Sequence, residues 1–242
     1  MIKLLKHLVW LWKNHGQVGM PLGSEQMAAG EMLGLGNLKY KKSPKLSPVT
    51  LDRNKKIPAY IENSPAPEIN QGTIGSCVCC TLVSIVIDEK IEQTKNNNFW
   101  IDWKLVWNEM KDLQIADDKQ GSFLENALWY FQEYGFTAID GTVIFPKNIQ
   151  KVDPKDVDIY LANRYEIMTG CAIASPMTDK NWFLRLVKDT VGGHCWKIIG
   201  KMANSNRIDE TSWDDYGYKD EGQFFHLKIQ DKLLFSMYVI EI

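Results

Sequence analysis

The chain has 242 residues, of which 45% are hydrophobic and 24% are charged, and its formal net charge is −2. This length fits one domain with an additional arm, or two small lobes that share a cleft. The composition is that of a globular protein and excludes collagen-like, coiled-coil and disordered chains. No apolar run reaches the roughly 18 residues of a transmembrane helix, so none is expected.

The charge is distributed unevenly along the chain. Residues 1–60 contain ten Lys or Arg and only three Asp or Glu, whereas the remainder is acidic. We therefore divide the chain into a basic N-terminal arm, residues 1–56, and a compact domain, residues 57–242. Such an arm docks on the acidic body or reaches an anionic partner. We do not expect that partner to be a nucleic acid.

The first 15 residues form a predicted amphipathic helix with a basic stripe that includes Lys3, Lys6 and Lys13. Helices of this kind lie on a membrane surface or bind a partner groove, and the alternative is packing on their own domain. The apolar run is too short for a signal peptide. Five cysteines without a disulfide framework also argue against secretion. We expect a cytoplasmic or virion-associated protein.

A helical half precedes a β-rich half. Helices are predicted over residues 76–94, 101–113 and 123–134. Ser76 is the expected N-cap of the first, and Ser122 with Glu125 forms an expected capping box for the third, which Gly135 ends. A shorter helix is predicted over residues 25–33. Turn residues then separate short predicted strands at 142–145, 172–174, 195–201, 223–229 and 233–242.

The segment from Gln71 to Cys77 carries the first chemical signal. It places the Cys77 thiol in the first turn of a predicted buried helix, where free backbone amides and the helix dipole stabilise a thiolate. The thiolate is the nucleophilic form of cysteine. Gln71 lies on the incoming loop, where its side-chain amide and the Cys77 backbone N–H would stabilise an oxyanion beside the sulfur.

A thiolate nucleophile needs a group that accepts and returns a proton. His194 follows Gly192 and Gly193 at the start of a predicted strand, 117 residues after Cys77. A histidine there is held by a rigid element, and the glycines leave room beside it. One group from each half predicts a cleft between two lobes. Cys79, Cys80 and Cys195 are expected to be core residues, as are Trp103 and Trp107.

These segments resemble papain-like cysteine peptidases. Gln71 six residues before Cys77 resembles the family's active-site segment, and Gly-Gly-His at 192–194 resembles the segment around its histidine. Residues 120–122 resemble the place where paired glycines bind substrate backbone, and residues 212–225 resemble the Asn-Ser-Trp-Gly region. The resemblance implies an α+β papain-like fold, with a helical lobe, a β-barrel-like lobe and the active site in the cleft between them.

The resemblance also implies roles for further residues. Gly121, Ser122 and Gly193 are expected to bind substrate. Thr211 aligns with the asparagine that orients the histidine in the family, and its hydroxyl is a shorter, freely rotating substitute. Four neighbours are alternatives to Thr211: Asp209, Glu210, Asn204 and Asn206. Val78 stands where the family has tryptophan, and Ile74 stands where it often has a disulfide cysteine.

The predicted function is hydrolysis of peptide bonds in a protein or peptide substrate, through an acyl-enzyme on Cys77 with His194 as general base and acid. No metal is expected, because no cysteine–histidine pattern has zinc-ligand spacing, and the predicted chemistry needs no organic cofactor. Two alternatives stay open. The first is an inactive papain-like module used for binding or scaffolding in a virus particle, and the second is a thiol amidase that acts on cell-wall peptide.

Overall fold

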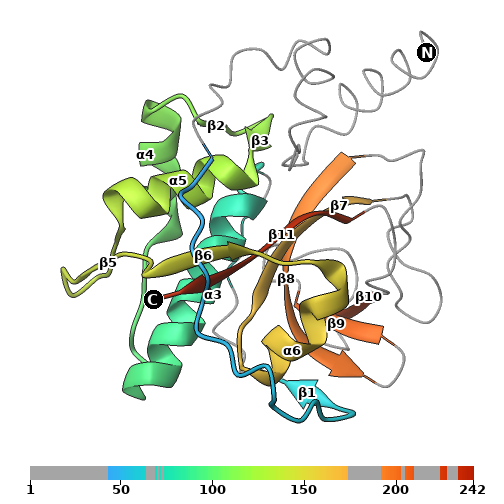
Figure 1. Ribbon diagram of the computed structural model, residues 1–242. Helices are drawn as coiled ribbons and strands as arrows, with labels where there is room; N and C mark the ends of the chain where they lie inside the picture. Colours follow the sequence, from blue (N-terminus) through green and yellow to red (C-terminus); the bar gives the residue numbers. More distant parts are fainter. Residues whose placement is uncertain are drawn as a thin grey trace, which may run out of the picture.

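The computed structural model describes residues 43–63, 69, 71, 74–173, 192–202, 205–209, 224–227 and 234–242. Within these residues a helical lobe lies beside an antiparallel sheet (Figure 1). The predicted arm helix at residues 1–15 and the helix at 25–33 lie outside the described residues. The division of the chain at residues 56 and 57 stays a prediction.

The helical lobe contains three helices: α3 (Cys77–Thr94), α4 (Trp103–Asp112) and α5 (Leu124–Tyr134). Residues 77–88 of α3 are all buried, so this helix is surrounded by protein over its first three turns. Two small hairpins join the lobe: β2 (Ala116–Asp117) pairs with β3 (Gly121–Ser122), and β4 (Phe136–Thr137) pairs with β5 (Val143–Ile144).

The sheet forms the second lobe, and its strand order is β10–β9–β8–β7–β11–β6, with β1 also pairing with β8. All pairs are antiparallel. The strands are β1 (Ile61–Glu62), β6 (Asn148–Lys151), β7 (Ile167–Ile173), β8 (Gly192–Met202), β9 (Ser205–Asp209), β10 (Phe224–Leu227) and β11 (Leu234–Glu241). Over the described strands the sheet is open, with β6 and β10 at its ends.

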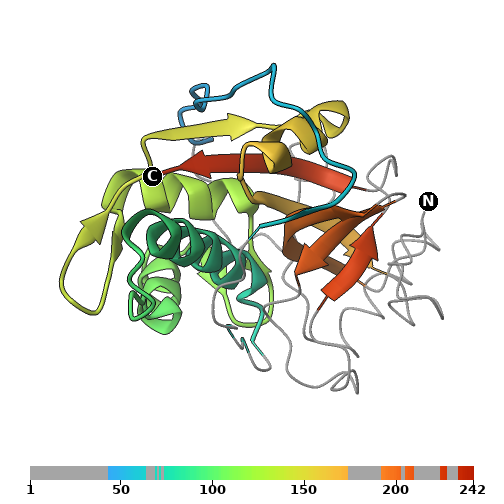
Figure 2. The same ribbon diagram turned by 90° about the horizontal axis from the view of Figure 1, so that it is seen from below.

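Two hydrophobic clusters cover the two faces of the sheet. One lies between the sheet and the three helices and includes Cys195 of β8. The other includes Trp196 and Ile198 of β8 and packs against α6 (Val157–Ala162), which follows the short 3₁₀ helix η1 (Pro154–Asp156). Helices α3 and α6 thus lie on opposite faces of the sheet (Figure 2). Alternate side chains of β8 are therefore buried in different cores.

The three long helices confirm the predicted helices, and Ser76 is the N-cap residue of the first as predicted, but the capping box predicted for the third is wrong. Ser76 occupies the N-cap position of α3, yet its hydroxyl lies 3.5 Å from the Cys80 sulfur and caps no backbone amide. Ser122 belongs to β3 and donates to the Ile115 carbonyl oxygen, so Phe123 becomes the N-cap of α5. Glu125 accepts a hydrogen bond from Tyr238 instead of closing a capping box.

The β-rich half contains elements that the sequence did not indicate. Helix α6 and strands β6 and β9 were not predicted, because each is short and lacks a clear apolar alternation. Strand β7 begins five residues before its predicted start, and β8 begins at Gly192 and includes His194. The predicted strands near the C-terminus correspond to β10 and β11. Among the described residues, no helix is long and apolar enough to cross a membrane.

Residues 43–53 run across the domain surface and bond to it at several points. The Ser47 backbone donates to Ile149, Thr50 bonds to the Glu241 carboxylate, and Asp52 and Asn163 bond each other. Val49 is buried in the cluster with α6. Ile242 is bonded to the helical lobe, because the Glu89 carboxylate of α3 accepts a 3.1 Å hydrogen bond from the Ile242 backbone amide.

Replacement of Glu89 by Gln is expected to flatten the pH dependence of folding stability. Burial raises the pKa of Glu89 from 4.5 to about 7, with the charge of Glu241 adding to the effect. The folded state therefore holds more protons than the unfolded state between these two values, so stability falls as pH rises through this window. Glutamine keeps an acceptor for Ile242 but has no proton to release.

Urea unfolding at about pH 5 and at about pH 8 measures this effect. The wild-type chain should lose more unfolding free energy over this interval than Glu89→Gln. The matched control is Glu133→Gln on the exposed surface of α5, which should keep the wild-type slope. Equal slopes for Glu89→Gln and wild type would contradict the prediction.

Candidate active site

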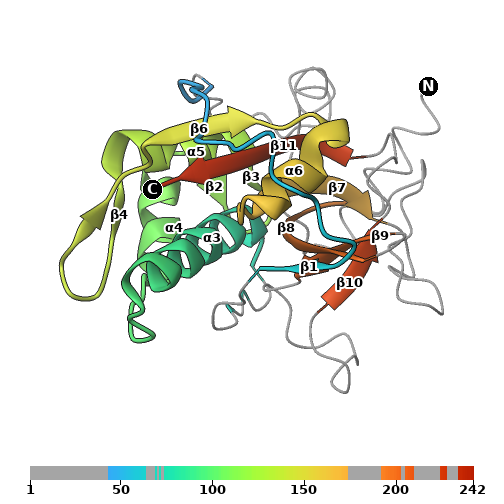
Figure 3. The ribbon, with the colours of Figure 1, turned by 60° about the horizontal axis from the view of Figure 1, so that its bottom comes forward.

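Cys77 is the first residue of α3, and a hydrogen bond one turn later fixes this end of the helix against β8. The Thr81 hydroxyl donates to the Cys195 carbonyl oxygen at 3.0 Å, and Cys195 directly follows His194. In Figure 3, α3 and β8 lie side by side. The fold thus brings together the helix that carries the predicted nucleophile and the strand that carries the predicted base, although these two residues are 117 positions apart in the sequence.

His194 is the third residue of β8 and lies opposite Cys171 of β7. Its ring meets the Trp196 ring edge-on, with 4.7 Å between their centroids. This contact restricts how far the imidazole can rotate. The side chains of Cys77 and His194 are both fully buried in this structure. Cys195 belongs to the core cluster beneath the three helices, as the sequence predicted, whereas Trp196 belongs to the cluster around α6.

The loop before Cys77 is held against β3. The Gly75 amide donates to the Asp118 carbonyl oxygen at 2.8 Å, and a Cβ on Gly75 would lie 3.1 Å from the Gly121 nitrogen. Gly121 and the segment leading to Cys77 are therefore in direct contact. The backbone of Gly121 and Ser122 lies beside the predicted nucleophile, whereas the Ser122 hydroxyl is committed to Ile115.

Asp118 anchors this contact to the helical core. Its carboxylate accepts a 2.7 Å hydrogen bond from the buried Trp107 indole and pairs with Lys111 at 3.1 Å. Desolvation opposes ionisation of this carboxylate, but the bonds from Trp107 and Lys111 outweigh it and lower the pKa of Asp118. In the family that the sequence resembles, a cysteine often stands at the position of Ile74. Here hydrogen bonding through Asp118 secures the neighbouring loop.

Gln71 is buried, and its side-chain nitrogen donates to the Ile74 carbonyl oxygen at 2.8 Å. An amide nitrogen carries two hydrogens, so this bond leaves one of them for a second acceptor. The bond also ties the Gln71 side chain to the residue three positions before Cys77. The loop thus fixes the amide that was predicted to stabilise an oxyanion.

Thr211 lies outside the described residues, as do two of its alternatives, Asn204 and Glu210. The backbone register places the other two on β9. Asn206 lies opposite Lys201, which is seven residues from His194 along β8. The distance between these two positions on β8 is about 23 Å, too far for Asn206 to bond to His194. Asp209 lies opposite Lys197, three residues or about 10 Å from His194. Asn206 is therefore excluded as the group that orients the histidine. Gly193 pairs with Ala172 of β7.

The other cysteines near Cys77 are poor nucleophiles. Burial raises the pKa of the Cys79 thiol well above its ordinary value, and the adjacent Cys80 and Cys77 add to this effect. Burial also raises the pKa of Cys80, against a smaller opposing effect of the hydrogen bond with Ser76. Both thiols therefore stay protonated at neutral pH, as expected for core residues. Among the described residues, no group of His, Cys, Asp and Glu has the arrangement of a metal site.

Three supporting residues were not identified from the sequence: Thr81, Asp118 and Trp196. Thr81 lies one helical turn after Cys77, and Trp196 lies two residues after His194, so both spacings place them on the same face as the predicted catalytic residue. A search at these offsets would have found them. Asp118 gave no signal, because its partners Gly75 and Trp107 are defined only by the tertiary fold.

The structure has the papain-like α+β fold. Three solved structures are similar to it: xylellain, a cysteine protease from Xylella fastidiosa, proCathepsin B S9 from Trypanosoma congolense, and digestive procathepsin L 3 from the larval midgut of Tenebrio molitor. Their TM-scores are 0.68, 0.62 and 0.61, and their sequence identities are 15%, 13% and 10%.

The similarity extends over nearly the whole of each chain. The similarity to xylellain covers 93% of this chain and 96% of xylellain. For the cathepsin B structure it covers 93% of this chain and 100% of that chain, and for the cathepsin L structure 100% of this chain and 88% of that chain. No protein-family model and no curated protein matches the sequence. At these identities the similarity defines the fold, and the chemistry is argued from the residues of this chain.

Proposed function

We propose that this chain is a cysteine peptidase that hydrolyses peptide bonds in a protein or peptide substrate. The observation that carries the proposal is the hydrogen bond between Thr81 and Cys195, which joins the turn after Cys77 to the residue after His194. The papain-like fold supports the same assignment. Because the side chains of Cys77 and His194 are both buried in this structure, a substrate reaches the Cys77 thiol only when the surrounding structure opens.

In the first half of the reaction, the Cys77 thiolate attacks the carbonyl carbon of the scissile peptide. A carbon–sulfur bond forms, and the carbonyl electron pair moves onto oxygen. The protonated His194 ring then gives its proton to the leaving nitrogen as the carbon–nitrogen bond breaks. The product is an amine and a thioester on Cys77.

In the second half, His194 accepts a proton from a water molecule that attacks the thioester carbon. The carbon–sulfur bond breaks, the carboxylic acid product leaves, and the thiolate is restored with the proton on His194. The edge contact with Trp196 holds the imidazole in place through both steps. Thr211 stays the proposed residue behind the ring.

The oxyanion of each tetrahedral intermediate needs donors fixed before it forms. We assign the Cys77 backbone amide, in the first turn of α3, and the Gln71 side-chain amide, which the bond to Ile74 holds on the incoming loop, as these donors. Gly121, Ser122 and Gly193 are proposed to bind substrate backbone on either side of the scissile bond.

Replacement of Gln71 by Ala is expected to lower kcat by about 10²–10³-fold, as for loss of one oxyanion donor. The loss should fall mainly on kcat, because the donor acts on a charge that is present only in the transition state. Steady-state hydrolysis of a fluorogenic peptide measures it. Gln93→Ala, at the far end of α3, is the control and should keep wild-type turnover. A Gln71→Ala variant with wild-type kcat would remove Gln71 from the oxyanion site.

A thiol-directed covalent probe tests the proposed function. Peptide mapping should find label on Cys77 at near-neutral pH, at a rate well above that of a free thiol, and His194→Ala should abolish this excess. Labelling of wild type at only the free-thiol rate would reject the peptidase and favour an inactive module. Digestion of casein but not of peptidoglycan separates a peptidase from a cell-wall amidase.

A further inference from the structure

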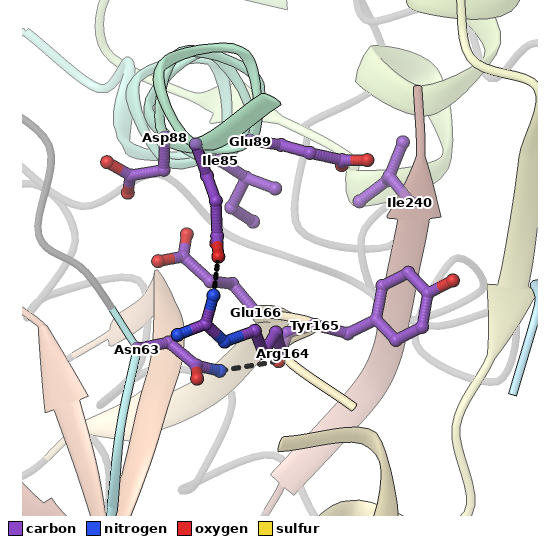
Figure 4. Close-up of a pocket in the computed structure, with 9 residues that line it drawn as sticks. Asn63, Ile85, Asp88, Glu89, Arg164, Tyr165, Glu166 and Ile240 are labelled. Atoms are coloured by element: carbon purple, nitrogen blue, oxygen red, sulfur yellow. Dashed lines mark hydrogen bonds and ion pairs between the residues drawn. The ribbon is translucent and has the colours of Figure 1, made fainter. Parts of the chain in front are cut away.

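A second set of buried charges links the same two elements that carry Cys77 and His194. Lys197 of β8 is fully buried and forms an ion pair with Asp88 of α3. It also lies 3.5 Å from Glu166, which directly precedes β7. Figure 4 shows the Asp88 and Glu166 carboxylates on the same side of the small cavity between α3 and the sheet. We refer to Lys197, Asp88 and Glu166 as the buried ion cluster.

Folding stability alone does not account for this cluster. Transfer of one ammonium and two carboxylates from water costs several kcal/mol per ion, and apolar side chains of similar volume often give equal or greater stability. The cavity beside the cluster has a volume of about 30 Å³, room for roughly one water molecule and too little for an organic ligand. A role in geometry remains, because paired buried charges tolerate little displacement.

The cluster and the Thr81 bond together fix the angle between α3 and β8. One polar bond restrains the packed helix at a single point along the strand, whereas two separated bonds also restrain its angle. Asp88 follows Thr81 by seven residues, or about 10 Å along the helix, and Lys197 follows Cys195 by two residues, or about 7 Å along the strand. Both attachments are buried, and the low dielectric of the interior strengthens them.

We propose that Lys197, Asp88 and Glu166 are positioning residues that set the distance and orientation between the Cys77 sulfur and the His194 ring. This inference rests on the proposed peptidase function. The cluster does not touch the substrate, because Asp88 lies eleven residues, or about 16 Å, from Cys77 along α3. Its effect on catalysis passes through the rigid helix and strand.

The test replaces the whole cluster by apolar side chains, Lys197→Met with Asp88→Leu and Glu166→Met. The variant is expected to keep or raise the wild-type Tm, because the cost of burying the charges is removed. Its kcat on a fluorogenic peptide should fall on the order of 10–100-fold, with KM within about twofold, since misplacement of reacting groups by about 1 Å has effects of this size. A purely structural role would change Tm and leave kcat unchanged.

Lys201→Met is the matched control. Lys201 lies on the same strand and pairs with Asp158 of α6, so its loss removes an ion pair of β8 that does not involve α3. Its kcat should equal that of wild type. If the triple variant does not fold, Asp88→Asn carries the test, with an expected loss of kcat of about tenfold or more at unchanged KM.

Two failures are distinguishable. A wild-type chain that hydrolyses no peptide rejects the proposed function, and the inference falls with it. An active wild type together with unchanged kcat in the folded triple variant, or in Asp88→Asn, overturns the inference alone. A fall in kcat of the same size in Lys201→Met would also overturn it, because the effect would then belong to β8 in general.

Discussion

Replacement of Cys77 by Ala is expected to reduce peptide hydrolysis by at least about 10⁴-fold, because removal of a covalent nucleophile has effects of this order or larger. Cys77 is the thiol at the N-terminus of α3, whereas Cys79 and Cys80 have pKa values raised by burial and stay protonated. No neighbouring thiol therefore replaces it. Active-site titration and steady-state turnover measure the loss.

Cys79→Ala is the matched control, since it makes the same chemical change two residues along the same buried helix. Its sulfur lies 3.6 Å from the Trp103 carbonyl oxygen in the helical core, so its removal leaves a small cavity. We expect a loss of about 1 kcal/mol in unfolding free energy with unchanged turnover. If Cys77→Ala hydrolysed the peptide at the wild-type rate, or if a folded Cys79→Ala variant lost its turnover instead, Cys77 would not be the nucleophile.

The helical lobe was predictable because its signals are local. The spacing of apolar residues indicated α3, α4 and α5, and Gly135 marked the end of α5. Trp103 and Trp107 were correctly assigned to the core. The hydrogen bonds of the two predicted capping serines were not predictable, because the Ser76 hydroxyl contacts the Cys80 sulfur within its own helix and Ser122 donates to the Ile115 carbonyl oxygen. A side chain that suits a cap binds elsewhere when the fold supplies a buried acceptor.

The sheet was less predictable because its pairing is not local. Lys197 is an example, because a lysine in a strand is normally predicted to be solvent-exposed. It is instead fully buried against Asp88 and Glu166, which come from two other segments of the chain. Likewise, the sequence motifs indicated Cys77 and His194 but not the bonds that hold their elements together. These bonds depend on the packing of α3 against β8, which no local pattern encodes.

Replacement of Gly75 by Ala is expected to lower kcat/KM by on the order of 10²-fold. An added Cβ would lie 3.1 Å from the Gly121 nitrogen and 3.2 Å from both the Gly121 Cα and the Asp118 carbonyl oxygen. All three are backbone atoms, and Trp107 holds Asp118 in place. The loop before Cys77 must therefore move away from β3, which shifts the nucleophile relative to the proposed substrate-binding backbone. Overpacking of this kind also costs about 1–3 kcal/mol in stability.

Gly141→Ala separates the effect on the site from the general cost of adding a methyl group to a glycine. A Cβ on Gly141 would meet no atom within 4 Å, but its φ of +85° is unfavourable for alanine. We expect a loss of about 1–2 kcal/mol from backbone strain with wild-type kcat/KM. Gly75→Ala and Gly141→Ala should thus have similar stabilities and different activities. Similar activities would mean that contact between the Gly75 loop and Gly121 does not determine the position of Cys77.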